Sequence, residues 1–246
     1  MRGRDIGVDE AGRGSVVGPL VVCAMAVPEE DRGILVDIGA DDSKKLSKKK
    51  RGAVVSEIDR LSDSRGWGVG EIVCSPSRID IGMMTGNLNS LEVELFAEAV
   101  NAAMEPNGNC RIILDACDVN ASRFGENVRS ELGEGWRGCR ILSEHGMDGK
   151  DVVVGAASTI AKFRRDAEVA KLTSDIGIEL GSGYPSDPLT RTAVRELSAG
   201  QLPHECLRWS WSTVSDIWTE THRRPVPTRD AGATHPMQSS LEDWNQ

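Results

Sequence analysis

The sequence contains no run of about 18 apolar residues, the length that a membrane-spanning helix needs, and we therefore expect no membrane span. The N-terminus enters a strand-like segment without the apolar core of a secretory signal, which predicts a cytoplasmic protein. No two cysteines have the C-x-x-C spacing of a zinc or redox site. We expect all six to remain free thiols, several of them within apolar runs: Cys23, Cys74, Cys110, Cys117, Cys139 and Cys206.

What is present is the composition of an ordinary globular protein, with 39% hydrophobic and 27% charged residues in 246. The net charge of -9 argues, on average, against a nucleic-acid partner, because phosphate binding needs a basic surface. The positive charges are clustered, however. Residues 44–51 read KKLSKKKR, and Lys162, Arg164 and Arg165 follow on a predicted helix. Either cluster alone fits a solvated face, but acids gathered at a metal site would also lower the net charge without removing a basic rim.

Strand signals dominate the first 150 residues, and helical periodicity dominates from Val152 onward. Apolar runs predict strands at residues 5–9, 19–27, 67–73, 110–114 and 140–142. Caps and apolar stripes predict helices that start after Ser47, at Asn89, near Val152, at Asp187-Pro188 with a stop at Gly200, and after Trp211. We therefore predict an α/β sheet core at 1–150, a helical segment at 151–222 and a Pro-rich flexible tail at 223–246.

Four acidic residues fall where active sites are usually built. Asp9 and Glu10 close the first strand, Asp115 closes the strand at 110–114, and Asp148 lies just before a helix. Carboxylates that converge at a sheet edge repel one another unless a cation joins them, and Mg²⁺ or Mn²⁺ prefer oxygen ligands. Two such ions can activate a water and stabilise the leaving oxygen of a phosphodiester. Each acid alone is explained more simply as a turn or cap residue, so the hypothesis depends on all four together.

A glycine-rich turn follows the acidic pair. Gly12 and Gly14 allow the backbone to approach a ligand closely, and Arg13 offers a planar fork to a phosphate. The next glycine, Gly18, leads into a strand instead of a helix, so this is not a dinucleotide-binding fingerprint. The turn therefore predicts contact with a substrate and no dinucleotide cofactor.

The string GVDEAGRGSVVGPLVVCA at residues 7–24 resembles the signature of type 2 ribonuclease H, ribonuclease HII. Further segments resemble the same family in the same order: DDSKKLS at 41–47, ILDACDVN at 113–120, EHGMDGKDVVVGAASTIAK at 144–162, GSGYPSDPLT at 181–190 and RWSWST at 208–213. DEAGRG and GSGYPSDP are most similar to the archaeal branch. Type 3 enzymes carry G-T-G in the turn, so type 2 is preferred.

The resemblance implies a ribonuclease H-like mixed central sheet flanked by helices, with a C-terminal helical segment. It implies roles for residues at matching positions. The metal-binding catalytic acids would be Asp9, Glu10, Asp115 and Asp148. The substrate-binding residues would be Gly12, Arg13 and Gly14 at the ribonucleotide, Tyr184 near its 2′-hydroxyl, and Lys44 and Lys45 near the nucleic-acid backbone.

The resemblance also implies the reaction. The family hydrolyses the RNA strand of RNA/DNA hybrids and nicks DNA on the 5′ side of embedded ribonucleotides, leaving 5′-phosphate and 3′-hydroxyl ends, with Mg²⁺ or Mn²⁺ and in two-metal-ion fashion. We expect a monomer that serves DNA replication and ribonucleotide excision repair. Two rivals are another metal-dependent nuclease of the same superfamily, such as a junction resolvase, and a non-catalytic hybrid-binding module.

Several residues depart from the family pattern or leave two interpretations open. Ser15 stands where the family often has Pro or Ala, and we expect no consequence. Asp151 is an alternative to Asp148 as the fourth acid, and His145 either assists catalysis or is a loop residue. Trp209 and Trp211 fit core packing better than base stacking.

The last residues contain a candidate partner-binding motif. Gln238, Leu241 and Trp244 follow the Q-x-x-h-x-x-a spacing by which replication enzymes dock on the sliding clamp, although Asn245 replaces the usual second aromatic residue. A Pro-rich tail that presents one helical turn of anchors suits helix-in-groove recognition. The sequence therefore predicts a sliding clamp as a partner.

Overall fold

The computed structural model describes residues 3–40, 46–106 and 108–229, which form two compact units. Unit 1 takes the chain up to Ala11, Val21–Ile72 and Asn89–Arg164, and unit 2 takes Gly12–Leu20, Val73–Leu88 and the chain from Arg165 onward. The predicted division at residue 150 follows the order of the sequence, whereas contacts group separate segments together. Among the described residues, no helix is long and apolar enough to cross a membrane.

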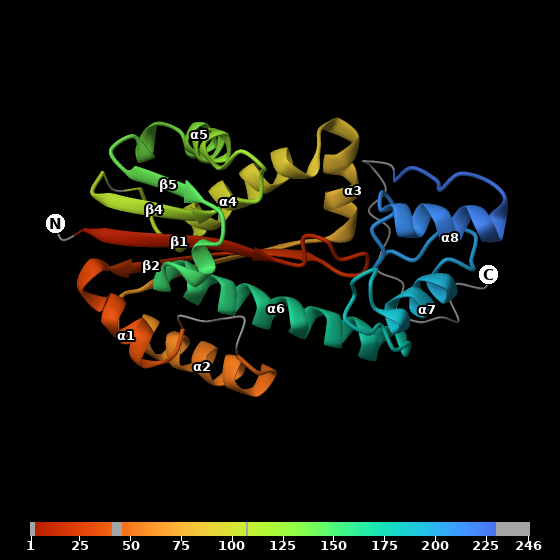
Figure 1. Ribbon diagram of the computed structural model, residues 1–246, viewed down its shortest axis with the longest axis horizontal. Coiled ribbons are helices and arrows are strands. Elements are labelled where there is room, and N and C mark those ends of the chain that lie inside the picture. Colours follow the sequence, from red (N-terminus) through yellow and green to blue (C-terminus); the bar gives the residue numbers. More distant parts are fainter. Residues whose placement is uncertain (1–2, 41–45, 107, 230–246) are drawn as a thin grey trace. The chain divides into compact units, whose positions relative to one another are not determined.

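Unit 1 is built mainly on a five-stranded sheet in the order β3-β2-β1-β4-β5 (Figure 1). The strands are β1 (Arg4–Ala11), β2 (Leu20–Pro28), β3 (Gly68–Cys74), β4 (Cys110–Asp115) and β5 (Arg140–Glu144). β1 pairs antiparallel with β2 and parallel with β4, and β4 pairs parallel with β5. The five predicted strands are confirmed, and each observed end lies within two residues of the predicted one.

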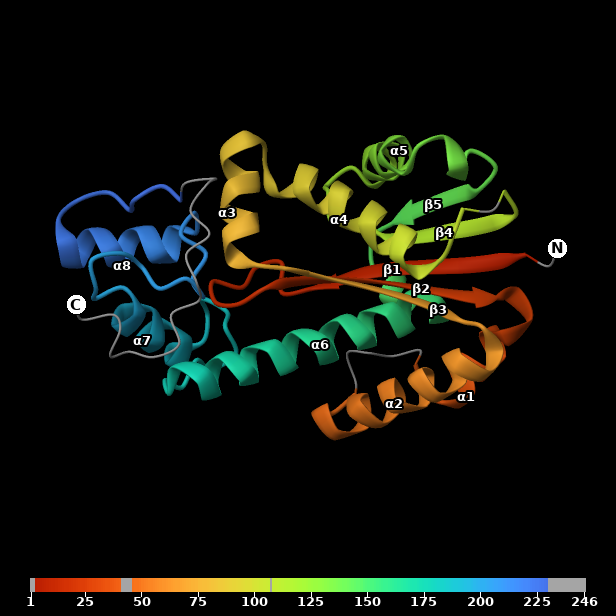
Figure 2. The ribbon, with the colours of Figure 1, turned by 180° about the vertical axis from the view of Figure 1, so that it is seen from behind.

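Helices cover both faces of this sheet (Figures 1 and 2). One face carries α4 (Leu88–Ala103) and α5 (Ala121–Leu132), and the other carries α1 (Arg32–Asp37), α2 (Lys48–Arg65) and α6 (Val152–Ile176). Short 3₁₀ turns lie at Glu29–Asp31 (η1), Glu134–Trp136 (η2) and Met147–Gly149 (η3). The mixed α/β fold expected from the sequence is confirmed.

Local capping explains where several helices begin. The Ser47 hydroxyl accepts a hydrogen bond from the Lys50 amide at the start of α2, and Asp187 accepts one from the Leu189 amide at the start of α7 (Pro188–Leu197), as predicted. The prediction that Asn89 caps a helix was wrong, because α4 already begins at Leu88. The predicted stop at Gly200 was late, because α7 ends at Leu197.

Three helices were not predicted: α1, α3 and α5, of which α3 and α5 carry a local signal. α3 (Pro76–Thr85) begins with a Ser75 cap and a proline in its first turn. α5 is capped by Asn120 and buries Phe124 and Val128 on one face.

The packing of α6 against β1 sets the geometry of unit 1. A Cβ atom at Gly7 of β1 would lie 2.4 Å from the backbone carbon of Val153, so only glycine permits this approach. On the neighbouring strand β2, alternate side chains point toward α1, α2 and α6. Two of them, Met25 and Val27, pack with Ile160 of α6 in one buried cluster. The start of α6, and with it η3, is therefore held against β1.

A disulfide joins Cys110 and Cys139, whose Cα atoms are 4.8 Å apart, so the expectation that every cysteine is a free thiol was wrong for this pair. β4 and β5 pair in parallel with Arg111 opposite Arg140, and each cysteine comes one residue before these, Cys110 on β4 and Cys139 directly before β5. Their proximity therefore depends on a strand register that sequence spacing does not reveal. The other four cysteines are free thiols.

Unit 2 contains α3, the second half of α6, α7 and α8 (Ser212–His222) around a separate apolar cluster. Trp209 and Trp211 pack against this cluster, which confirms their predicted core role. Residues 223–229, predicted as the start of the tail, pack on unit 2 as well. The Pro225 carbonyl accepts a hydrogen bond from Trp218, and Arg229 forms a 2.7 Å ion pair with Asp80. Asp80 also accepts hydrogen bonds from the backbone amides of residues 209 and 210.

Candidate functional site

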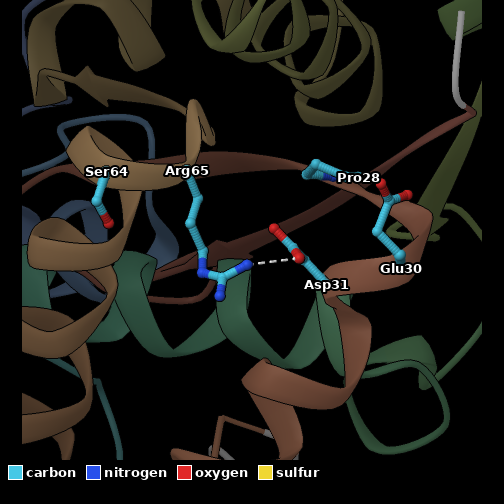
Figure 3. A pocket seen from close by; sticks show the side chains of 5 residues that line it. All are labelled: Pro28, Glu30, Asp31, Ser64 and Arg65. Atoms are coloured by element: carbon cyan, nitrogen blue, oxygen red, sulfur yellow. Dashed lines mark hydrogen bonds and ion pairs between the residues drawn. The ribbon is translucent and has the colours of Figure 1, made fainter.

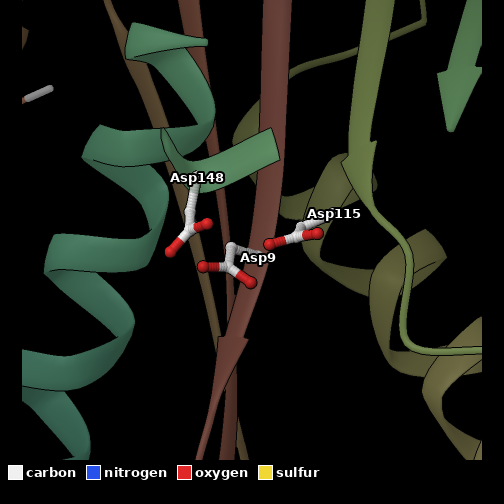
Figure 4. A group of neighbouring side chains, drawn as sticks. All are labelled: Asp9, Asp115 and Asp148. Atoms are coloured by element: carbon white, nitrogen blue, oxygen red, sulfur yellow. The ribbon is translucent and has the colours of Figure 1, made fainter. Parts of the chain in front are cut away.

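Three of the four predicted acids come together in unit 1. Asp9 of β1, Asp115 at the end of β4 and Asp148 of η3 each offer a carboxylate oxygen, and these oxygens lie within 4.8 Å of one another (Figure 4). The parallel register places Val8 opposite Leu114, so the two aspartates that follow emerge at the same edge of the sheet. A set of oxygen ligands this close suits a hard divalent cation.

Backbone amides hold Asp115 in place. Its Oδ1 accepts hydrogen bonds from the N–H groups of Gly146 at 2.7 Å and Met147 at 3.3 Å. Gly146 has a φ of 68°, a left-handed conformation that a glycine adopts without strain, and η3 with Asp148 follows directly. One loop therefore fixes the orientation of Asp115 and the position of Asp148.

Burial makes Asp9 hard to ionise. Its pKa is raised well above the usual value, first by burial, then by repulsion from the Glu10 carboxylate and a hydrogen bond shared with it, while a hydrogen bond with Ser158 lowers the pKa. Only 5% of Asp9 is exposed. A divalent cation would remove this repulsion and favour the charged carboxylate, so the donor set fits a metal.

Glu10 lies outside the three-aspartate group, although it contacts Asp9. Burial raises the pKa of Glu10, a hydrogen bond with Asp9 lowers it, repulsion from Glu92 raises it, and a hydrogen bond with Cys117 lowers it. Glu92 is a fully buried acid of α4 that the sequence analysis did not single out, because it lies within an apolar helical stripe. Glu10 is thus placed between the aspartates and a further carboxylate.

A lysine of α6 supplies positive charge beside the acids. Lys162 Nζ donates to the Ser158 hydroxyl at 2.8 Å and lies 3.9 Å from Asp148 Oδ2. The two α6 residues are four positions apart and therefore share one face of the helix. The sequence indicated Lys162 only as part of a basic cluster and gave no reason to single out Ser158.

Asp151 caps a helix and does not belong to the group of three aspartates. Of the two alternatives for the fourth acid, Asp148 is the one that lies in this group. Asp151 Oδ1 accepts a hydrogen bond from the Val153 amide at 2.9 Å, and Oδ2 forms a 2.8 Å ion pair with Arg32. His145 is exposed, and its Nε2 lies 2.8 Å from the Asp118 carbonyl, which ties together the loops after β4 and β5.

The predicted substrate turn belongs to unit 2. Gly12 has a φ of +89°, and a Cβ there would lie 2.8 Å from the Pro19 carbonyl oxygen, so the turn requires glycine at this position. The guanidinium of Arg208 donates to the carbonyls of Gly12 at 2.7 Å, Arg13 at 2.8 Å and Gly18 at 3.1 Å. Burial, helped by repulsion from Arg165, lowers the pKa of Arg208 to about 10.

Tyr184 lies beside this turn within unit 2, although the two segments are far apart in the sequence. A Cβ at Gly14 would lie 4.0 Å from Tyr184 Cε1, and the Val16 amide donates to the Gly183 carbonyl at 2.8 Å. Gly14 is exposed and Tyr184 is half-buried, so a ligand can reach both.

The expectation that Ser15 has no consequence was wrong. Its hydroxyl, fully buried, accepts a 2.6 Å hydrogen bond from Nη2 of Arg165. The remaining predicted site residues, Lys44, Lys45, Gln238, Leu241 and Trp244, lie outside the described residues.

A hollow on unit 1 holds none of the predicted site residues and serves the fold (Figure 3). Its lining is Pro28, Glu30, Asp31, Ser64 and Arg65. Asp31 pairs with Arg65 at 2.8 Å and accepts a hydrogen bond from the Trp67 indole at 2.7 Å. These contacts fasten the end of α2 to η1.

Comparison with known proteins identifies the family of this chain. The model of the ribonuclease HII family matches residues 6–214. The chain belongs to the ribonuclease HII family. A ribonuclease HII of Methanocorpusculum labreanum is 42% identical over 213 residues, which cover 86% of this chain and 92% of that protein.

Solved structures of the same kind are similar in fold. The crystal structure of ribonuclease H2 from Pyrococcus horikoshii OT3 matches with a TM-score of 0.78 and 34% identity, and it covers 90% of this chain and 100% of that one. The ribonuclease HII in a PCNA complex from Archaeoglobus fulgidus matches with a TM-score of 0.73 and 34% identity, covering 87% of this chain and 96% of that one. The ribonuclease H-like fold and the type 2 assignment are therefore confirmed, and the protein is a nuclease that hydrolyses nucleic acid.

Proposed function

We propose that Asp9, Glu10, Asp115 and Asp148 form a metal-dependent catalytic centre. The enzyme hydrolyses the RNA strand of RNA/DNA hybrids and nicks on the 5′ side of ribonucleotides embedded in duplex DNA, giving 5′-phosphate and 3′-hydroxyl ends. The observation that carries this proposal is the group of three aspartates whose oxygens lie within 4.8 Å of one another.

The chain's own residues would hold the metal and orient the substrate. Two Mg²⁺ or Mn²⁺ ions, bound by the four acids, would supply an activated water and stabilise the charge on the leaving oxygen. Asp115 is pre-oriented by the Gly146 amide, which limits reorganisation when a cation binds. Lys162, beside Asp148, carries a charge that offsets the repulsion among the acids.

Selection of RNA falls to the turn and the tyrosine of unit 2. The exposed backbone at Gly14 and the half-buried ring of Tyr184 offer a surface that contacts a ribose 2′-hydroxyl, the group that distinguishes RNA from DNA. Gly12 and Arg13 would contact the same ribonucleotide, and Lys44 with Lys45 would contact the nucleic-acid backbone.

The partner proposal concerns the C-terminal tail. Gln238, Leu241 and Trp244 have the spacing of a sliding-clamp motif, and a related ribonuclease HII was solved in complex with PCNA. We propose that the tail docks a monomeric enzyme, acting in the cytoplasm, on the clamp. Removal of residues 238–246 would then abolish co-elution with the clamp and leave the rate of hybrid cleavage unchanged.

The decisive experiment uses three duplexes of one sequence that contain a single ribonucleotide, a stretch of RNA, or DNA only. We expect nicks beside ribonucleotides in Mg²⁺ or Mn²⁺, none in the DNA duplex, and none in an all-DNA four-way junction. Asp115→Asn keeps the oxygen that accepts from the Gly146 and Met147 amides, so the loop should persist while the rate falls at least about a hundredfold.

Glu144→Gln is the matched control. Glu144 is the exposed residue paired with Asp115 in the strand register, and it lies outside the acidic group. An Asp115→Asn enzyme as active as Glu144→Gln would refute the catalytic assignment. Cleavage of the junction would instead favour a resolvase.

A further inference from the structure

Arg165 is a buried cation of unit 2 that the proposed chemistry does not use. Only 6% of it is exposed. Its Nη2 donates to the Ser15 hydroxyl at 2.6 Å and also to the Ser182 carbonyl, and Nη1 lies 3.6 Å from Asp166 Oδ1. The guanidinium therefore joins two loops that are 167 positions apart, since Ser15 follows the glycine turn and Ser182 precedes Tyr184.

The same guanidinium lies over the ring of Tyr184, with its central carbon 4.8 Å from the ring centroid. Its stem lies against the turn, because a Cβ at Gly12 would be 3.3 Å from Arg165 Cγ. A Cβ at Gly183 would be 2.5 Å from Nη2, so glycine at that position is what lets the guanidinium fit beneath the loop. One side chain thus touches every segment that forms the surface assigned to the ribose.

We propose that Arg165 is the positioning residue that holds the Tyr184 ring at a fixed place beside the Gly12–Gly14 turn, and that it thereby sets how efficiently the enzyme acts at a single 2′-hydroxyl. This inference rests on the proposed function of that turn and tyrosine. A site that recognises one hydroxyl depends on placement, and a misplacement of about 1 Å can change a rate by about a hundredfold.

The chemistry of arginine suits this role better than that of lysine. A planar guanidinium stacks on an aromatic face while its N–H groups donate in the plane, whereas a lysine ammonium is a point charge that cannot do both in the same geometry. Ser15 contributes directly, because its hydroxyl is an acceptor that Pro or Ala at this position would not provide.

The test is a double-mutant cycle in the full-length enzyme, with Arg165→Met, Tyr184→Ala and the pair combined. The measured quantity is kcat/KM on a duplex with one ribonucleotide, divided by that on continuous hybrid, where many registers of the substrate can be used. In the wild-type enzyme, we expect Arg165→Met to lower this ratio about tenfold or more. In the Tyr184→Ala variant, the same substitution should lower the ratio by less than about twofold. An equal fall in both backgrounds would overturn the proposal, since Arg165 would then act without the ring.

Three further variants separate positioning from folding. Ser15→Ala removes one acceptor and leaves the backbone intact, so the ratio should fall a few-fold while the melting temperature falls by only a few degrees. Arg165→Lys should recover the melting temperature that Arg165→Met loses, but it should not recover the kcat/KM ratio. Arg191→Met, the same substitution at an exposed arginine of α7, should leave both unchanged.

The outcomes also separate this proposal from the one beneath it. If Arg165→Met does not fold, an unchanged ratio in both Ser15→Ala and Arg165→Lys refutes the positioning role. If the wild-type enzyme cuts none of the ribonucleotide duplexes, the proposed function itself has failed. If the wild type cuts them and the cycle is additive, only the role of Arg165 is lost.

Discussion

Protonation of one buried histidine is expected to weaken unit 2 in mild acid. His204 is 5% exposed, and its Nδ1 accepts a 3.2 Å hydrogen bond from the Cys206 amide. Burial, together with the positive charge of Arg229, lowers the pKa of His204 from 6.5 to about 4. An accepting Nδ1 carries no proton, so protonation there would break this hydrogen bond as well as place a charge in the interior.

The sign and size of the effect follow from the two pKa values. The unfolded chain takes up a proton near pH 6.5, whereas the folded chain resists until about pH 4. Between these values the unfolded state binds more protons, so the stabilisation is fully present above pH 6.5 and is lost as the pH falls toward 4. The difference, 6.5 minus about 4, is about 2.5 pH units, and at 1.36 kcal/mol per unit it corresponds to about 3 kcal/mol.

Urea unfolding of the wild type and of His204→Asn, from pH 8 to pH 4, measures this contribution. The asparagine oxygen can replace Nδ1 as the acceptor, and asparagine does not titrate, while every other group titrates alike in both proteins. We expect the wild type to lose about 3 kcal/mol relative to the variant over this range. Parallel stability curves would show that His204 titrates normally in the folded state and would refute the reasoning.

Two further predictions concern the turn and the disulfide. Gly12→Ala should lower the free energy of unfolding by about 1–3 kcal/mol, because φ is +89° and the new Cβ would clash with the Pro19 carbonyl. Gly14→Ala should melt normally but cut ribonucleotide substrates more slowly, since its Cβ fits 4.0 Å from the Tyr184 ring; equal melting temperatures for the two variants would contradict this. Cys139→Ser should lower the free energy of unfolding in urea by about 3–4 kcal/mol, as expected for a 29-residue separation, and a reductant should have no further effect on that variant.

Apolar runs predicted the strands, because a buried strand needs continuous hydrophobic side chains. Asp9 and Asp115 lie toward the ends of two of these strands, which pair in parallel, and they therefore meet at one edge of the sheet. Asp148 was preferred to Asp151 through the family resemblance, because the residues alone do not reveal that Asp148 belongs to a 3₁₀ turn and Asp151 to a helix cap. The difference depends on backbone conformation.

Other site features depend on tertiary contacts that leave no pattern in the chain. Arg208 reaches the turn across nearly 200 positions, and Ser15 acquires its role only because Arg165 is buried beneath it. Cys110 and Cys139 meet through strand register. In contrast, the start of α3 could have been predicted from the sequence, because Ser75 and Pro76 form a typical helix-start pattern.

Gly7 carries no chemical group, yet a screen for loss of nuclease activity should return substitutions there. A methyl group at this position would meet the Val153 backbone at 2.4 Å and would push the start of α6 away from β1 by roughly an ångström. Asp148 comes four residues before α6 begins, so the damage would reach an acid that the mutation does not touch. A substitution at Gly7 would then lower activity by displacing Asp148. Neither added metal nor a change to the acidic residues would restore the activity.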